Sequence, residues 1–387
     1  MSAKALAPPT RPQTGFVRRH AAKLIVSTVL TTSLVYMLAT GKIDFVPKGG
    51  SYDRVRWWTV PVYVATLVAL NYYRAIRWRF LLRATVDVPK AKLVSVSWVG
   101  FLAIMLVPFR LGEFVRPFML RDPGRMQDGK LVGHVSMPMA TGTIAGERVI
   151  DALYLGLVLA AALLATPVLV PLSTVVEGLP VPVTVGQVRA YGFAMLGLFT
   201  VVFIVTAVFY FARAWAHRLT LAVFGLVSRP LGEKLAGIAE RLADGLHLLG
   251  RGRDAWPFLA ETTIYWGLNA LGMWILAWGC GVTHADGSSI GFIEACSLMG
   301  MLGITIMVPG PPGLLGFFQA GIYAGMTMYY PRDIVLGPGR AFAFMLYAIQ
   351  LSWCVLSAVG CLAFDRSARH ALEEAGEAEL QASQAEA

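Results

Sequence analysis

The stretch Val107-Pro-Phe-Arg-Leu-Gly-Glu-Phe-Val-Arg-Pro-Phe-Met-Leu120 decides how the surrounding chain folds. It follows an apolar segment and places Arg110, Glu113 and Arg116 three residues apart. On a helix this spacing puts the three side chains on one face, as a row of cation, anion and cation. A proline at each end of the row argues against a long regular helix. Charges beside lipid are costly, which leaves two alternatives: anchoring at the membrane interface, or a functional site.

The composition indicates an integral membrane protein. The chain has 387 residues, of which 56% are hydrophobic and 14% are charged, whereas soluble domains carry about 25% charged residues. We predict an all-α, polytopic fold of about seven or eight transmembrane helices, with one or two broken or re-entrant segments. The net charge of +10 lies in loops between apolar segments, where it attracts anionic lipid headgroups. We therefore expect membrane lipids as partners and no nucleic acid.

Residue patterns for metal binding or catalysis are absent from the sequence. The six histidines are scattered, and the four cysteines lie in or at the ends of apolar segments without metal-type spacing. The chain has no Gly-x-Ser-x-Gly, no phosphate-binding loop with Lys and no His-Glu-x-x-His. We expect no metal, no cofactor and no catalytic residue.

We divide the chain into three parts. Residues 1–20 are a disordered N-terminal lead, 21–365 form a single transmembrane helical domain, and 366–387 are an acidic tail. Basic residues precede an apolar run at 24–40, which is typical of a signal peptide or of a retained first span. We favour a retained span, since no small-x-small cleavage site follows, and we place the N-terminus in the cytoplasm and the protein in the inner membrane.

Charge asymmetry predicts the topology of the following segments. A basic cluster follows the apolar segment 57–73 and marks a cytoplasmic loop; it comprises Arg74, Arg77, Arg79, Arg83, Lys90 and Lys92. The loop 213–257 is rich in Arg and is also expected to be cytoplasmic, with an amphipathic helix inside it. The chain between these loops must cross an even number of times. Either 93–109 and 131–147 are two short spans, or 93–120 is a re-entrant hairpin.

An internal echo links two interrupted segments. Val107-Pro108 with Gly112, and Val308-Pro309 with Gly313, share the pattern V-P-x-x-x-G. Transporters place such interruptions at matching positions in two halves, with the substrate site between them. The alternative is that Pro and Gly mark two turns at the membrane edge. For the second segment we predict a crossing at 313–330 that is broken by glycine.

Two charged sets are candidates for substrate binding. Arg110 and Arg116 present planar guanidinium groups suited to phosphate oxygens, and Glu113 between them is placed to hold both. Three further charged residues share one helical flank, either as part of a site or as a salt-bridged helix start: Glu147, Arg148 and Asp151. Glu294 is a separate candidate, because an acid inside an apolar segment is uncommon.

Three motifs resemble one known family. Pro108-Phe-Arg-Leu-Gly-Glu-Phe-Val-Arg116, Glu147-Arg-Val-Ile-Asp151 and Pro312-Gly-Leu-Leu-Gly-Phe-Phe-Gln319 are similar to motifs of the lysylphosphatidylglycerol synthase transmembrane region family, which is also described as flippase-like. The resemblance implies an inner-membrane protein that handles phospholipid or lipid-linked substrates. By position, the resemblance assigns family motif residues to Arg110, Gly112, Glu113, Glu147, Arg148 and Asp151. The set that we predict to bind substrate further includes Arg116, Pro309, Gly313, Gly316 and Gln319. The third motif departs from the family pattern, with Leu314 and Gln319 where a glycine and a glutamate are expected.

Three functions remain open at this point. The leading one is a lipid flippase or transporter that binds phosphate-bearing headgroups. The second is a membrane-embedded transferase that acts on a lipid headgroup, with Glu113 or Asp151 as its base. The third is a non-transporting accessory protein that binds envelope enzymes through 213–257. Bifunctional relatives carry a soluble aminoacyl-transferring domain, and because none follows residue 365 here, lysyl-lipid synthesis is not expected.

Overall fold

The structure is a computed structural model of the whole chain. It describes Pro47 and residues 50–364, with gaps at 84–85, 123–124, 128–129, 133, 167–170, 172, 176–182, 226–227, 229, 231–232, 234–236, 238–251 and 308–311. The predicted lead at 1–20, the predicted span at 24–40 and the acidic tail lie outside the described residues, as does Pro309.

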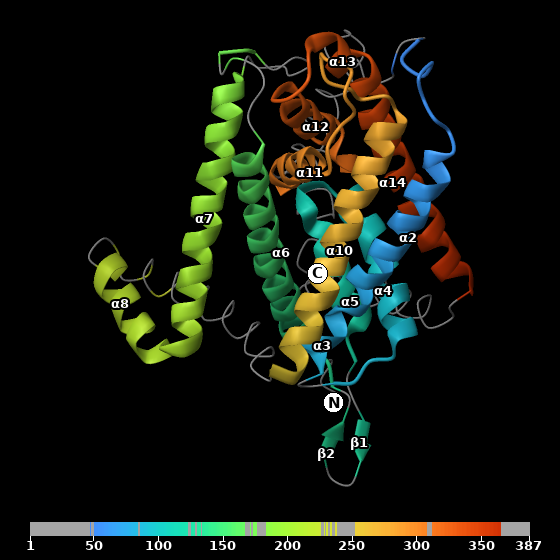
Figure 1. Cartoon of the computed structure of the whole chain (residues 1–387). Coiled ribbons are helices and arrows are strands. Elements are labelled where there is room, and N and C mark those ends of the chain that lie inside the picture. The colour runs from blue at the N-terminus through green and yellow to red at the C-terminus, as the bar shows by residue number, and fades with distance from the viewer. Residues whose placement is uncertain are drawn as a thin grey trace, which may run out of the picture.

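The described chain is helical, as the sequence predicts, and long helices run between two ends of the molecule (Figure 1). They are α2 (Thr59–Ile76), α6 (Met137–Ala165), α7 (Val185–Phe211), α10 (Gly252–Gly279) and α14 (Pro338–Phe364). One element was not predicted: a short antiparallel hairpin of β1 (Arg125–Gln127) and β2 (Lys130–Val132), which projects from the lower end in Figure 1.

Two helical segments among the described residues are long and apolar enough to cross a membrane. They are Met137–Ala165 and Arg332–Phe364, the second of which joins α13 (Arg332–Leu336) to α14. Helix α6 begins where the Ser136 hydroxyl accepts a hydrogen bond from the backbone N–H of Met139 at 3.4 Å. This N-cap satisfies one of the four free N–H groups at the helix start.

The opening stretch lies at the tip of a hairpin, which we call the lower hairpin. It consists of α4 (Lys90–Leu106), the 3₁₀ helix η1 (Pro108–Phe114) and α5 (Val115–Leu120). The turn η1 packs back against α4, and α5 leads to β1 at the lower end (Figure 1). The chain at 93–120 therefore turns back on itself. The alternative of a separate short span at 131–147 is wrong, because this range contains β2 and the first turns of the continuous helix α6.

A second hairpin, which we call the upper hairpin, enters from the opposite end. It consists of α11 (Phe292–Met307), the 3₁₀ turn η2 (Pro312–Leu314) and α12 (Phe317–Thr327). Helix α12 packs along α11 and leads to α13 at the upper end (Figure 1). The predicted crossing at 313–330 is thus wrong, because this segment folds back. The tips η1 and η2 contact each other.

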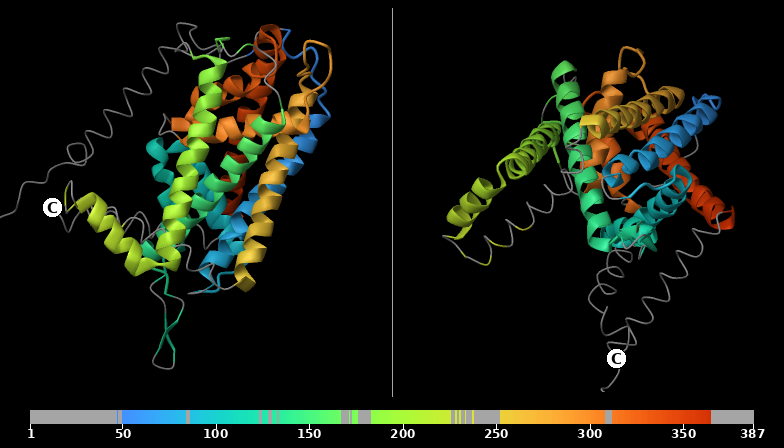
Figure 2. Two further views of the ribbon diagram at one scale, coloured as in Figure 1. Left: turned by 60° about the vertical axis from the view of Figure 1, so that its left-hand side comes forward. Right: turned by 90° about the horizontal axis from the view of Figure 1, so that it is seen from below.

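Two predicted loops contain helix. Residues 78–82 form α3 (Trp78–Leu82), whose side chains other than Arg79 are buried, because four of its five residues are large and apolar. Within 213–257, the structure has α8 (Arg213–Gly225) and the first turns of α10, which begins at Gly252. Figure 2 shows α8 pointing away from the bundle, next to α7.

The buried apolar side chains form two clusters. One includes Tyr63, Tyr265 and Leu298 and fills the space between α2, α10 and α11. The other includes Trp78, Val96 and Phe258 and lies around the lower hairpin. The buried charged residues described next contact aromatic rings of both clusters.

Candidate substrate-binding site

Arg77 is the residue around which the charged site is built. It lies at the junction of α2 and α3 and is completely buried. Its Nη1 and Nη2 donate to the two carboxylate oxygens of Asp151, each at 2.7 Å. Nη2 also donates to Glu147 at 2.9 Å, and Nη1 donates to the Thr262 hydroxyl at 3.1 Å. This bidentate, charge-assisted arrangement fixes α2, α6 and α10 relative to one another.

Glu147 of α6 joins three arginines from different elements. Its Oε1 accepts from Arg77 and from Arg148 at 2.8 Å, and its Oε2 accepts from Arg116 of α5 at 3.2 Å. Arg148 also reaches Asp151 at 3.4 Å. The predicted meeting of Glu147, Arg148 and Asp151 on one flank is confirmed by these distances. Arg116 connects this flank to the lower hairpin.

The cluster holds more positive than negative charge. Three arginines (Arg77, Arg116 and Arg148) form ion pairs with two carboxylates (Glu147 and Asp151), which leaves an excess of one positive charge among these five side chains. Buried ions need partners for all their hydrogen-bonding groups. Arg116 is completely buried, yet its Nε and Nη2 have no partner among the described residues. The cluster is therefore suited to an additional anion.

Aromatic rings supply the remaining contacts of the guanidinium groups. The Cζ of Arg116 lies 4.4 Å from the ring centre of Trp78 and 5.3 Å from that of Phe101. The Cζ of Arg74 also lies close to Phe101, at 4.1 Å from its ring centre. Arg74 is half-buried and forms no ion pair with a described residue. It extends the positive charge from the cluster toward α4.

The first predicted motif is placed as follows. Arg110 belongs to η1, and its side chain lies outside the described part of the chain. Gly112 packs so closely on α4 that an added Cβ would overlap the backbone of Ala103. Arg116 pairs with Glu147 of α6, and η1 ends between Glu113 and Arg116. The predicted row of Arg110, Glu113 and Arg116 stays a prediction, because the Arg110 side chain lies outside the described residues. Glu113 interacts electrostatically with Arg148.

The third motif, Pro312–Gln319, lies at the tip of the upper hairpin and contains no charged residue. Gly313 and Gly316 have φ values of 75° and 82°, which favour glycine. The hydroxyl of Tyr347 donates to the carbonyl of Gly313 at 2.8 Å. Gln319 is buried; its Oε1 accepts from the N–H of Gly316 at 3.0 Å, and its Nε2 has no partner among the described residues.

Glu294 lies apart from the charged cluster, at the start of α11. Its Oε2 accepts from the Tyr330 hydroxyl at 2.6 Å and from the N–H of Gly291 at 2.9 Å, and its Oε1 lies 3.1 Å from His284 Nε2. Burial and the hydrogen bond to this carboxylate raise the pKa of Tyr330. These contacts assign Glu294 to holding the α10–α11 loop against the end of α12.

Sequence analysis missed Arg77 as a site residue, since its neighbours Arg74, Arg79 and Arg83 made it one member of a basic loop. A signal was present: Arg77 stands directly between the apolar helix that ends at Ile76 and the apolar run Trp78–Leu82. A charge flanked by apolar residues on both sides is costly in a membrane protein unless it is paired.

Comparison with known proteins identifies one family. The sequence model described as the lysylphosphatidylglycerol synthase TM region matches residues 21–360. Searches of curated proteins and of solved structures returned no match.

Proposed function

The chain belongs to the lysylphosphatidylglycerol synthase TM region family and is a membrane protein, and from this premise we propose that it is a lipid flippase or transporter. In this proposal the buried arginine cluster binds the phosphate of a lipid headgroup, and membrane lipids are the partners. The observation that carries the proposal is Arg116, whose Nε and Nη2 are buried without a partner among the described residues.

Guanidinium groups bind phosphate through parallel N–H donors. Arg116 presents its free Nε and Nη2 along one edge of the guanidinium group, while Nη1 stays on Glu147. A phosphate bound there would neutralise the excess charge of the cluster and satisfy both donors. Glu147 would keep its hydrogen bonds to Arg77 and Arg148 throughout.

The contact between η1 and η2 supports a path for the headgroup. Irregular backbone at membrane depth is stable only where protein covers it or water fills a cavity. Two interrupted segments that enter from opposite ends and meet are the arrangement by which transporters build a substrate site between two halves. The predicted pairing of the two V-P-x-x-x-G motifs becomes, in this proposal, a pairing of two hairpin tips.

We also propose an orientation, with the lower end of Figure 1 in the cytoplasm. Basic residues near this end include Arg79, Arg83 and Lys90, and positive charge is retained on the cytoplasmic side. The long helices, the two hairpins and the predicted span at 24–40 are the basis for about seven or eight membrane segments. A single cysteine placed in the β1–β2 hairpin should react with a membrane-impermeant thiol reagent only after the cells are opened.

The transferase alternative is weaker on chemical grounds. The Asp151 carboxylate accepts two hydrogen bonds from Arg77 and one from Trp266 Nε1 at 3.3 Å. All the hydrogen bonds described for this carboxylate come from protein donors on other helices, which gives Asp151 a role in holding α2 and α10 against α6.

A leaflet-exchange assay on the protein reconstituted in vesicles tests the proposal. We expect Arg116→Gln to reduce exchange of an anionic phospholipid by at least about tenfold, since one bidentate charge-assisted contact is lost. Arg116→Lys keeps the charge without the planar guanidinium group, so its exchange rate is expected to lie between those of the wild type and Arg116→Gln. Arg121→Gln is the matched control, because Arg121 is exposed and contacts only the Phe118 ring among the described residues.

Arg110→Ala and Glu113→Ala belong in the same series, since the family resemblance assigns them to the site. Thermal stability of each variant in detergent separates lost exchange from lost folding. Unchanged exchange in both stable Arg116 variants would exclude this residue as the phosphate-binding group.

A further inference from the structure

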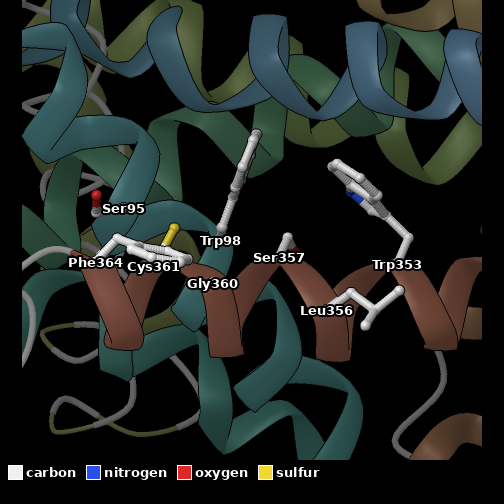
Figure 3. Close-up of a pocket in the computed structure, with 8 residues that line it drawn as sticks. All are labelled: Ser95, Trp98, Trp353, Leu356, Ser357, Gly360, Cys361 and Phe364. Atoms are coloured by element: carbon white, nitrogen blue, oxygen red, sulfur yellow. The ribbon is translucent and has the colours of Figure 1, made fainter.

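A groove between α4 and α14 opens beside the charged cluster. It has a volume of about 430 Å³, within the range of roughly 300–1,000 Å³ typical of small-molecule sites. Figure 3 shows its lining, with the indoles of Trp98 from α4 and Trp353 from α14 reaching into the space between the helices. The outer wall is formed by residues of α14: Leu356, Ser357, Gly360, Cys361 and Phe364.

The groove is lined mainly by apolar side chains, and one of them, Trp98, carries a buried N–H donor. The ring centres of Trp98 and Trp353 lie 5.4 Å apart in an edge-to-face arrangement. The Nε1 of Trp98 is a buried donor without a partner among the described residues. Leu356 and Phe364 are largely exposed on the outer side, at 68% and 91%. In a membrane protein this opening faces the lipid phase.

Arg74 relates the groove to the charged cluster, because it interacts with residues near both. Phe101 lies one helical turn after Trp98 on α4, and its ring contacts both Arg74 and Arg116. Arg74 also interacts electrostatically with Cys354, which follows Trp353 on α14. Arg74 thus lies within electrostatic range of Glu147 in the cluster and of Cys354 beside the groove. It forms no ion pair within 4 Å in the described part of the chain.

We infer that this groove binds one acyl chain of an anionic phospholipid, with the phosphate at Arg74 and the ester region near Trp98 Nε1. The inference deepens the proposed function and rests on it, since it names the tail site for the lipid whose headgroup the cluster binds. The apolar lining matches an alkyl chain, and the indole N–H without a described partner matches an ester carbonyl. The Arg74 guanidinium, which forms no ion pair within 4 Å among the described residues, matches a phosphodiester.

Photolabelling of the full-length protein tests the inference. The protein is placed in phosphatidylcholine vesicles with trace phosphatidylglycerol that carries a diazirine on one acyl chain, and labelled residues are mapped by mass spectrometry. We expect saturable labelling of the groove around Trp98 and Cys361, which excess unlabelled phosphatidylglycerol displaces. The exposed face of α7, with Leu198, Val201 and Ile204, reports bulk lipid and should label without saturation.

Two matched glycine-to-leucine substitutions test the groove: one fills it, and the other adds the same side chain on α7. An added Cβ at Gly360 meets no described atom within 4 Å, so Gly360→Leu fills the groove without disturbing the helix. We expect it to abolish the saturable labelling. Gly197→Leu on α7 is the control, because a Cβ there also meets nothing within 4 Å, and it should leave groove labelling unchanged.

A headgroup comparison tests the role of Arg74. Arg74→Gln should reduce labelling by the phosphatidylglycerol probe by about tenfold, while labelling by a diacylglycerol probe, which lacks the phosphate, stays as in the wild type. The inference is overturned if groove labelling does not saturate, or if Gly360→Leu leaves it intact. Loss of leaflet exchange in a protein whose groove still labels saturably would instead count against transport alone.

Discussion

The two hairpin tips are both interrupted helices, but side chains of different chemistry surround them. The lower tip lies beside buried ions: Arg116, just after η1, pairs with Glu147 of α6 at 3.2 Å. The upper tip uses neutral groups, since Tyr347 donates to the Gly313 carbonyl and Gln319 caps α12. Both tips are breaks in a helix where backbone groups lose their regular partners. Among the described residues, charged side chains therefore lie beside the lower tip and neutral ones beside the upper tip, and the proposed phosphate site is placed at the lower tip for this reason.

The difference also assigns separate tasks to similar motifs. Gly112 lies in η1 and Gly313 lies in η2, and the residues that follow each glycine differ in charge. Glu113 and Arg116 follow the glycine of η1, whereas Leu314 and Phe317 follow that of η2 at the same offsets. The internal echo is therefore a structural similarity between tips that meet, with charge confined to one of them.

The largest expected effect comes from removing Arg77, the centre of the charged cluster beside the lower tip. Arg77→Gln removes three hydrogen bonds to Glu147 and Asp151 and one to Thr262. Breaking a buried ion pair costs about 3–5 kcal/mol, because the remaining charges stay unpaired. We expect a large fall in folded yield and in the thermal midpoint measured in detergent.

Arg83→Gln is the matched control for Arg77→Gln. Arg83 lies on the same basic segment, but its side chain is 45% exposed and its distance to Asp254 is 3.4 Å. Exposed pairs of this kind contribute about 0–1 kcal/mol. Equal losses in the two variants would contradict the central role given to Arg77.

A smaller effect is expected from adding a methyl group at each tip. In Gly112→Ala the new Cβ overlaps the Ala103 backbone of α4, which cannot move aside, so we expect a loss of about 1–3 kcal/mol. In Gly313→Ala the positive φ costs about 1–2 kcal/mol, and the new Cβ also lies only 2.9 Å from the Tyr347 hydroxyl, which must shift. The thermal midpoints should rank Gly142→Ala, where a Cβ meets no described atom, above both. A neutral Gly112→Ala would mean that η1 does not press against α4.

The smallest effect is expected at the neutral tip. Tyr347→Phe removes the 2.8 Å hydrogen bond to the Gly313 carbonyl, for an expected loss of about 0.5–1.5 kcal/mol. Tyr191→Phe on the exposed face of α7 is the control and should change nothing. Faster amide hydrogen exchange around 313–316 in Tyr347→Phe alone would locate the effect. A loss as large as that of Arg77→Gln would remove the distinction between the two tips.

Much of the architecture follows from local sequence. Proline and glycine at 107–117 predict a broken element, and the charge asymmetry around it requires an even number of crossings. The choice between two short spans and a hairpin depends on which helix η1 packs against. That contact joins residues on the two sides of the turn, such as Gly112 and Ala103, and neither the helical nor the strand period predicts it.

The site was predictable where partners are close in sequence. Glu147, Arg148 and Asp151 are one helical turn apart, so helical periodicity alone brings them together. Arg77 is 70 residues from Glu147 and 185 from Thr262, and its pairing depends on the tertiary packing of α2, α6 and α10. The contact of Arg116 with Glu147 was missed for the same reason, and Glu113, a near neighbour, was assigned in its place.

The Arg77 ion pairs also constrain how the protein is made. Arg77 is synthesised 70 residues before Glu147 and 74 before Asp151, and at a translation rate of about 5–20 residues per second this is a wait of roughly 4–14 seconds. During that interval its guanidinium has neither carboxylate, and a long side chain at a helix end stays at the headgroup layer. In the proposed topology, the segment that becomes α2 would therefore remain near the headgroup layer until α6 emerges. Insertion of the first half of the chain into the membrane would then be completed only after Glu147 and Asp151 have been synthesised.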